Sequence, residues 1–319
     1  MRKMFKRIPI PIAGLMLGLA GLGNIMAPYN NGFRYIAGLV SLIIGLLLTA
    51  KFITNNKMVK SELENPIKAS VLLTFPMGII ILSTYFIPLS SQFAQYFWYS
   101  GIILHIILLL KFTSKFIFNF DINKVYPSFF IVYVGIVVAS VTAPAFNQIQ
   151  LGRNIFWFGF LSYLVLLPIV AYRVFKVKKI KDIALPTITI FTAPAGLCLA
   201  GYMNTFLVKN IYLLGFLITM TLISITAVML YLPKMLSIDF CPSYSAFTFP
   251  FVITTIGLKG ASIYLIEEFG LYALKLPVQF IEIFTIVLVT YVLVKYTFYL
   301  INELNINSVY KRVYESNNS

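Results

Sequence analysis

The side chains that most often catalyse reactions or bind metals are scarce in this chain. Its 319 residues include one histidine, His105, two cysteines, Cys198 and Cys241, and ten acidic residues. A membrane enzyme needs histidine, aspartate or cysteine side chains in a cluster, and the sequence contains no such cluster. We therefore expect neither an enzyme nor a metal or cofactor site. We interpret His105 and the two cysteines as buried packing residues.

Helix-breaking residues in apolar segments are the more informative feature. In five such segments a proline or glycine lies seven to ten residues after the proline that opens the segment: Gly18, Pro76, Gly135, Pro194 and Pro250. Proline in a helix interior removes an amide donor and costs about 3 kcal/mol or more. Within a membrane such a break is tolerated where the freed carbonyl groups find partners or face a water-lined cavity. The repetition favours one shared cavity; separate packing kinks are the alternative.

Phe249 directly precedes Pro250, in the stretch AFTFPF, and could act on such a cavity. A phenyl ring on a narrow helix can close a pore by blocking or dewetting it. Its neighbours Phe247 and Phe251 point elsewhere, because residues i and i+2 lie on different faces of a helix. Packing is the alternative role for an aromatic ring in a membrane helix.

The composition indicates that the elements positioning these residues are membrane helices. Hydrophobic residues make up 60% of the chain and charged residues 11%, with a mean hydropathy of +0.89. Ordinary globular chains are about 45–50% apolar and about 25% charged. The apolar runs do not alternate with polar residues as β-barrel strands do. We predict an all-α polytopic membrane protein, with residues 1–319 forming a single domain of ten spans. The predicted spans are Ile8–Ala27, Phe33–Ile53, Ile67–Ile87, Phe93–Phe112, Pro127–Phe146, Gly152–Tyr172, Pro186–Leu207, Ile211–Leu232, Pro242–Ser262 and Leu276–Phe298.

The odd-numbered spans each begin with proline at a near-constant period. From Pro11 the opening prolines are separated by 55, 61, 59 and 56 residues, about the length of a helical hairpin with its loops. Proline is favourable in the first turn of a helix, where its missing donor would be unpaired anyway. The period predicts five repeated hairpins. The simplest arrangement places the odd helices as an inner ring around a central pore, with the even helices outside.

The distribution of basic residues predicts the orientation of the chain. If the N-terminus is cytoplasmic, 20 of the 25 basic residues lie on that side of the membrane. The exceptions are Arg34, Arg153, Lys209, Lys259 and Lys275. By the positive-inside rule, residues 1–7 and 299–319 are predicted to be cytoplasmic, in a multi-pass protein of the plasma membrane. The net charge of +15 is thus a topology signal and does not predict nucleic-acid binding.

The predicted pore lining favours small monovalent anions. Between their ends the odd spans contain no acidic or basic residue, and their polarity comes from hydroxyl and amide groups. Each odd helix points its positive N-terminal end at the cytoplasm, where Lys68 adds charge. Lys259, near the outer mouth, either attracts anions or reaches the lipid headgroups. A dianion would lose hydration in this lining with little compensation.

Glu282 is the only acidic residue well inside a span, which makes it a functional candidate. It lies in an outer span, about 10 Å of helical rise from Lys275. We expect it at the lipid interface, in a subunit contact or reaching toward the membrane surface. Proton coupling is the alternative.

Short motifs along essentially the whole chain resemble a known family. They are PIAGLMLGLAGL, NPIKAS, PSF, TAPAGLCLAGY and AFTFPF, in the first, third, fifth, seventh and ninth spans. They resemble the tellurite-resistance/dicarboxylate transporter (TDT) family, which includes the slow-type anion channels of plant guard cells and their bacterial TehA-like homologues. The resemblance implies a homotrimer in which each protomer has its own pore. It also implies that Phe249 is the pore gate.

The resemblance further implies that Gly14 and Gly18 leave room beside the gate. A helix-packing role for the same pair is the alternative. Pro250 departs from the glycine of the bacterial homologues, and we expect its bend to aim Phe249 across the pore.

We therefore predict a gated anion channel that conducts chloride or nitrate. Its expected partners are small anions, the lipid bilayer and further copies of the chain, with no nucleic acid. The alternative is a secondary transporter that exports C4-dicarboxylates, tellurite or sulfite. Such a transporter should carry a buried acid or a basic substrate ligand on its pore helices, and none is visible there.

Overall fold

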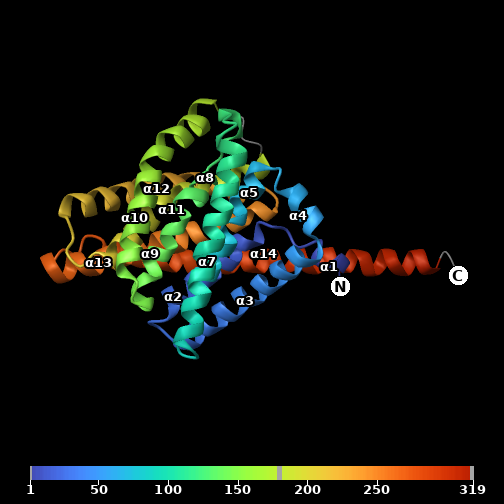
Figure 1. The fold of residues 1–319 in the computed structure, drawn as a ribbon, viewed down its shortest axis with the longest axis horizontal. Coiled ribbons are helices and arrows are strands. Elements are labelled where there is room, and N and C mark those ends of the chain that lie inside the picture. The colour runs from blue at the N-terminus through green and yellow to red at the C-terminus, as the bar shows by residue number, and fades with distance from the viewer. Residues whose placement is uncertain (1, 178–181, 317–319) are drawn as a thin grey trace.

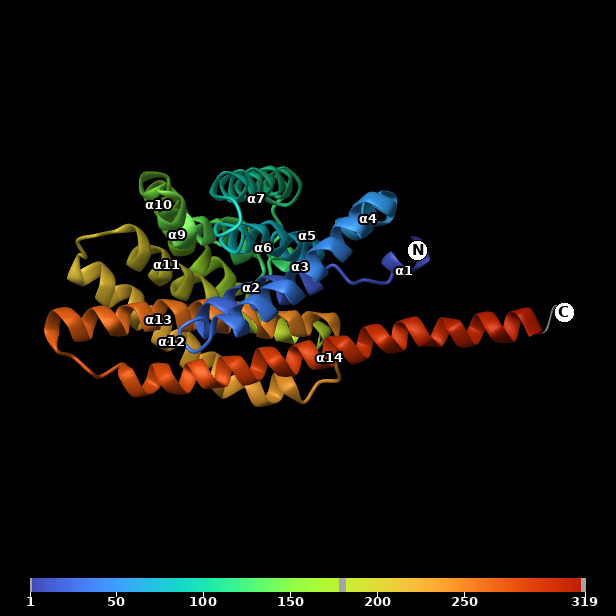
Figure 2. The same ribbon diagram turned by 90° about the horizontal axis from the view of Figure 1, so that it is seen from below.

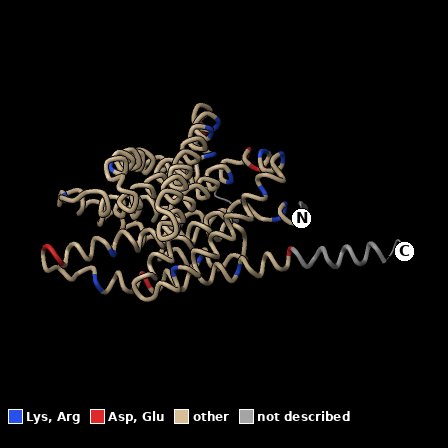
Figure 3. The backbone as a smooth tube through the Cα atoms, turned by 60° about the horizontal axis from the view of Figure 1, so that its bottom comes forward, with Lys and Arg blue, Asp and Glu red and all other residues tan. Residues whose placement is uncertain are grey.

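The computed structural model describes the backbone of residues 2–177 and 182–316, and all of its regular structure is helical (Figure 1). Within the described residues, eight helical segments are long and apolar enough to cross a membrane. The prediction of an all-α, multi-pass membrane protein is thereby confirmed. Charged residues lie mostly near the ends of the helices and in the loops between them (Figure 3).

The even-numbered predicted spans correspond to five long helices. These are α3 (Asn31–Thr54), α7 (Ser91–Phe112), α10 (Ile149–Ala171), α12 (Ile211–Leu236) and α14 (Lys275–Ser316). Two of them end in π-helical turns, Thr113–Ile117 after α7 and Tyr172–Val177 after α10. α14 continues through residues 299–316, which were expected as a tail, and extends past the rest of the molecule (Figure 2).

The odd-numbered predicted spans correspond to shorter and broken helices. They comprise α2 (Ile12–Met26), α5 (Pro66–Leu72) with α6 (Thr74–Ser83), α8 (Phe129–Tyr133) with α9 (Val138–Thr142), α11 (Thr192–Thr205) and α13 (Phe249–Phe269). Turns of 3₁₀-helix precede α11 at Asp182–Phe191 and α13 at Pro242–Phe247, and flank α9 at Gly135–Val137 and Ala143–Phe146. The short helices α1 (Arg2–Phe5) and α4 (Asn56–Glu62) lie outside the predicted spans.

The segments of the odd-numbered and even-numbered predicted spans differ in how much of each is buried. In their most apolar stretches, 78% of the residues are buried in Pro66–Ser83 and in Ala184–Thr205, and 61% in Pro242–Phe269. The corresponding share in the five long even-numbered segments is 28% to 39%. α2 buries nearly all of its residues. The broken helices therefore form the interior, and the long ones cover it.

The number of spans stays a prediction. The first predicted span contains the shorter apolar helix Ile12–Met26, and the fifth contains α8 and the shorter apolar segment Gly135–Phe146. The first is short because its helix begins only after Pro11. The fifth is broken by 3₁₀ turns on either side of α9.

The expected mid-helix prolines lie just after the start of a regular α-helix. Leu73 before α6 and Phe191 before α11 keep helical backbone angles, so the chain stays helical there, whereas Thr248 before α13 leaves the helical region. Pro250 is the second residue of α13, and Pro194 and Pro76 are the third residues of α11 and α6. In the first turn of a helix an N–H group has no intrahelical acceptor, so proline loses little there. Gly135 begins the 3₁₀ turn between α8 and α9. The breaks thus place each proline where it is tolerated.

Candidate pore and gate

A cavity of about 60 Å³ lies where the five odd-numbered segments meet. Each of the twenty described residues that line it belongs to one of these segments, and none of the twenty is charged. Five of the predicted site residues are among them: Gly14, Gly135, Pro194, Phe249 and Pro250. The predicted site residues Gly18, Pro76, Lys68 and Lys259 lie outside the lining. The cavity has room for a few water molecules.

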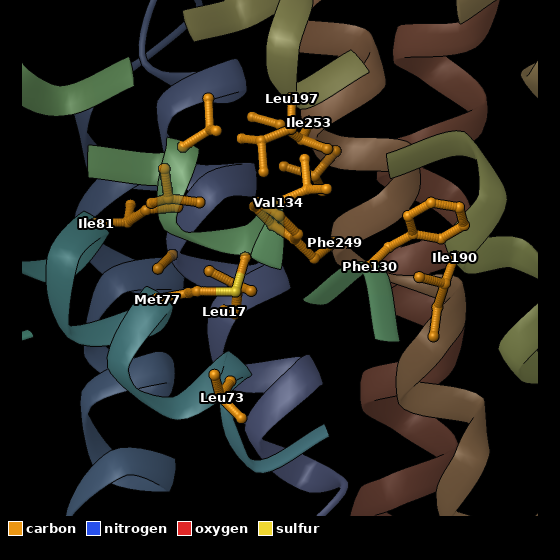
Figure 4. Close-up of a cluster of buried hydrophobic side chains, with 14 of the residues drawn as sticks. Leu17, Leu73, Met77, Ile81, Phe130, Val134, Ile190, Leu197, Phe249 and Ile253 are labelled. Carbon is orange, nitrogen blue, oxygen red and sulfur yellow. The ribbon is translucent and has the colours of Figure 1, made fainter. Parts of the chain in front are cut away.

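Phe249 lies within an apolar cluster that joins all five segments (Figure 4). Its side chain is 5% exposed and contributes to the cavity wall together with Met77, Val134 and Leu197. The cavity is lined by the N-terminal parts of the segments and reaches no farther along α11 than Leu197. Other members of the cluster lie outside the lining: Leu17, Leu73, Ile81 and Ile253. The cavity therefore ends in packed aliphatic side chains around the Phe249 ring.

The break before Phe249 is fixed by Thr248. Its backbone, with φ −95° and ψ −85°, is neither helical nor extended. Its hydroxyl lies 2.9 Å from the Gly14 carbonyl oxygen and 2.7 Å from that of Ser245, and donates to these acceptors. The first segment thereby anchors the residue that sets the direction of the ring.

Glycines in α2 allow this close approach. A Cβ atom added to Gly18 would lie 2.5 Å from Thr248 Cβ, and one added to Gly14 would lie 3.1 Å from Ser245 Cβ. Both glycines therefore contact the break and its preceding turn. Gly21 also approaches the ring: a Cβ added there would lie 2.6 Å from Val252 Cγ1 and 3.9 Å from Phe249 Cδ2. Gly21 is not among the predicted site residues, although its spacing of three from Gly18 places it on the same face of the helix.

The hydroxyl groups expected to make the lining polar are already hydrogen-bonded to the backbone. Thr74 donates to Val71 O at 2.7 Å, and Thr187 donates to Ala184 O at 2.6 Å. Thr189 bridges two segments by donating to Ala246 O at 2.6 Å. The last of these bonds satisfies the carbonyl group four residues before Pro250, which lacks the amide that would otherwise donate to it. All three bonds also leave the cavity wall predominantly apolar.

Lys68, predicted at the cytoplasmic mouth, is 43% exposed and paired with an acid. Its Nζ lies 3.3 Å from Glu62 Oε1. The other Glu62 oxygen lies 2.9 Å from Lys51 Nζ, which is buried and also donates to Ile8 O at 2.7 Å. Glu62 therefore offsets part of the positive charge beside this end of the third span.

Lys259 and Glu282 contact each other. Lys259 Nζ lies 2.7 Å from Glu282 Oε1, and the Tyr29 hydroxyl donates to the same oxygen at 3.2 Å. The Glu282 side chain is 4% exposed and that of Lys259 is 30% exposed. Each charge therefore has a partner. The roles considered from sequence, an outer-mouth or headgroup contact for Lys259 and a lipid-interface or subunit contact for Glu282, stay predictions. An ion pair across two helices could not be predicted from hydropathy.

His105 and the cysteines are buried, as expected for packing residues. His105 Nε2 lies 3.0 Å from Val132 O, so the neutral ring donates to a carbonyl beside the break in the fifth span. Across the described ranges, no group of three or more histidine, cysteine, aspartate or glutamate side chains is placed to hold a metal ion.

The chain was compared with known protein families. The family described as voltage-dependent anion channel matches residues 7–303, which include all ten predicted spans. No curated protein matches the chain. The family match confirms the resemblance that the short motifs indicated.

Proposed function

The chain belongs to the voltage-dependent anion channel family, and on that premise we propose that it is a gated channel for small monovalent anions such as chloride and nitrate. The observation that carries this proposal is the cavity that all five odd-numbered segments line, with Phe249 at its packed end. In the proposed closed state, the ring and its aliphatic neighbours exclude water and ions from the narrowest part of the pore.

The proposed architecture has ten spans in five hairpins. The protein lies in the plasma membrane, with both termini on the cytoplasmic side. The contrast in burial between the odd and even segments supports the inner ring. The distribution of basic residues supports the orientation. We extend the proposal to a homotrimer with one pore per protomer and to a protein without enzymatic activity.

The proposed selectivity follows from the uncharged wall. A chloride or nitrate ion that enters the cavity exchanges water for an apolar surface and hydroxyl groups that already donate to carbonyl groups. A dianion would lose far more hydration energy in the same place. The positive N-terminal ends of the odd helices lie toward this side and favour anions over cations.

Planar-bilayer recording from purified protein tests the proposal. We expect Phe249→Ala to carry chloride and nitrate currents at least about tenfold above wild type, because truncation removes the ring that fills the constriction. Phe251→Leu is the matched control, since Phe251 is buried against Phe284, with ring centres 5.5 Å apart, and does not line the cavity. Its currents should equal those of wild type.

A different outcome would identify the alternative function. If both proteins are silent and malate or tellurite uptake depends on a proton gradient, the chain is a coupled transporter and the channel proposal is wrong. Equal currents in Phe249→Ala and wild type would retain the channel but remove Phe249 as its gate.

A further inference from the structure

A groove of about 560 Å³ lies on the outside of the bundle and shares no lining residue with the pore cavity. It is bounded by the π-helical turn after α7, by the connection that follows this turn, by α8 and by α10. Two of its lining residues on α10, Leu161 and Val165, are 58% and 63% exposed. The groove therefore opens toward the lipid.

The groove is about as long as one leaflet of a membrane is thick. Its lining residues on α10 occupy one face of the helix from Phe158 to Ile169. At about 1.5 Å per residue this stretch rises about 16 Å, whereas the hydrocarbon core of a bilayer is about 30 Å thick. Ile169 lies just before the π-helical turn Tyr172–Val177, at the end of the sixth predicted span. One end of the groove is thus at the membrane surface, and the other is near mid-membrane.

The polar side chains that line the groove are already hydrogen-bonded. The Thr113 and Tyr133 hydroxyl oxygens lie 2.8 Å apart, and Thr113 donates to Leu109 O at 2.9 Å. Ser162 donates to Phe158 O on its own helix at 2.8 Å. All other lining residues are aliphatic or phenylalanine. An acyl chain, which needs no hydrogen bond, fits this lining better than a polar ligand does.

Two lysines lie beside the end of the groove at the membrane surface. Lys115 is in the π-helical turn between the lining residues Thr113 and Ile117. Lys124 directly precedes the lining residue Val125. Positive charge therefore accompanies the apolar groove where a lipid headgroup would lie.

Arg173 fixes the connection that carries Lys124 against the end of α10. It follows Ile169 by one turn on the same face of the chain. Its Nη2 donates to Asn123 O at 3.2 Å, and its guanidinium carbon lies 5.9 Å from the centre of the Tyr126 ring. Because these two contacts flank Lys124 in the sequence, this lysine is held at the surface end of the groove.

The acidic partners of the two lysines lie at the surface. Lys115 Nζ lies 2.5 Å from Glu64 Oε1, and the Glu64 side chain is 71% exposed. Lys124 Nζ lies 3.7 Å from Asp121 Oδ2. Exposed ion pairs of this kind contribute little to stability. A phosphate group can therefore replace these carboxylates at the lysines.

We propose that the groove binds one anionic phospholipid from the adjacent leaflet, with an acyl chain along α10 and the phosphate beside Lys115 and Lys124. Packing of the chain and attraction of the headgroup to the lysines supply the affinity. The bound chain lies behind the broken fifth span, because Phe129 and Tyr133 of α8 line the groove whereas Phe130 of the same helix lines the pore cavity.

Native mass spectrometry of the purified full chain tests the site, with phosphatidylglycerol as the anionic probe and phosphatidylcholine as the net-neutral one. Ser162→Trp fills the groove. Leu164→Trp is its control, because Leu164 is 39% exposed on the same helix and does not line the groove. Lys115→Gln/Lys124→Gln removes the two charges beside the groove. Its control, Lys57→Gln/Lys60→Gln, removes two charges from exposed positions of α4 outside the lining.

We expect wild type to bind one phosphatidylglycerol per chain about tenfold more tightly than phosphatidylcholine. The variant Lys115→Gln/Lys124→Gln should bind phosphatidylglycerol about three- to tenfold more weakly and phosphatidylcholine as wild type does. Ser162→Trp should lose the tightly bound lipid of either kind. Both controls should match wild type.

Three results would overturn the inference. One is equal affinity of wild type for the two lipids. Another is undiminished phosphatidylglycerol binding by Ser162→Trp or by Lys115→Gln/Lys124→Gln. The third is a wild type that binds no lipid while Ser162→Trp dissociates an oligomer that Leu164→Trp retains, because a second copy of the chain would then fill the groove. The assay requires no current, so this inference and the proposed channel function can fail separately.

Discussion

Removing either partner of the Lys259–Glu282 pair should destabilise the protein strongly. The loss in the free energy of unfolding should be larger when Lys259 is replaced than when Glu282 is replaced. The pair joins α13 to α14, which lie side by side (Figure 2). One turn away on the same faces, the Thr255 and Thr285 hydroxyl oxygens lie 2.9 Å apart. The ion pair is therefore part of the contact that holds the helix beginning at Phe249 against its outer neighbour.

The expected loss in the free energy of unfolding depends on which charge each substitution leaves buried without its partner. Breaking a buried ion pair costs about 3–5 kcal/mol, because the remaining charge stays buried without its partner. Lys259→Gln leaves the carboxylate of Glu282, which is 4% exposed, without an opposite charge and with neutral donors alone, among them the Tyr29 hydroxyl. We therefore expect the full range of about 3–5 kcal/mol for this variant. Glu282→Gln leaves a lysine that is 30% exposed and can reach water, so we expect a smaller loss of about 1–3 kcal/mol.

The assay is equilibrium unfolding in mixed lipid–detergent micelles, monitored by far-UV circular dichroism and completed as a double-mutant cycle. The double variant Lys259→Gln/Glu282→Gln buries no charge, so it should be more stable than Lys259→Gln alone. Lys57→Gln, an exposed charge removal, should change the free energy of unfolding by less than about 0.5 kcal/mol.

Two results would refute this reasoning. One is a Lys259→Gln variant as stable as wild type, which would mean that water or lipid headgroups already screen the carboxylate. The other is a double variant that loses the sum of the two single losses, which would mean that the two side chains do not interact.

Two further predictions concern the contacts around the breaks. Gly18→Ala places a methyl group 2.5 Å from Thr248 Cβ. It should lower the free energy of unfolding by about 1–3 kcal/mol and raise the leak current, because the clash displaces the gate residue Phe249. The control Gly215→Ala, with nothing within 4 Å of the added atom, should change neither quantity. His105→Phe leaves the buried Val132 carbonyl group without its donor and should cost about 1–3 kcal/mol in the same unfolding assay, whereas His105→Gln, which keeps an N–H donor, should lose less. Equal stability of the two His105 variants would show that the hydrogen bond contributes nothing.

The class of the protein and the places of its segments could be predicted from the sequence. Apolar length, charge placement and proline position are properties of a one-dimensional chain, and each acts locally through hydration or through a missing amide donor. The same information located Phe249, Pro250 and Pro194, which line one cavity although Pro194 lies on a different segment from the other two. The motifs also identified the family.

The form of the breaks depended on the tertiary structure. A proline predicts that a helix is interrupted, but whether the helix bends or restarts depends on what can accept and donate hydrogen bonds around it. At Thr248 those partners come from α2, more than two hundred residues earlier in the chain. No local pattern records such a contact.

Only the tertiary structure decided which side chains meet. The sequence presents Lys259 and Glu282 as two separate charges, and Arg173 as one of many basic residues near the ends of spans. Their partners are set by how each helix is rotated and shifted against its neighbour, which depends on packing summed over whole faces. Gly21 illustrates the same point, because its closeness to the Phe249 ring follows from the rotation of α2. The sequence therefore determined which elements form and where they lie along the chain, whereas the packing of those elements determined the chemistry of the cavity and its ends.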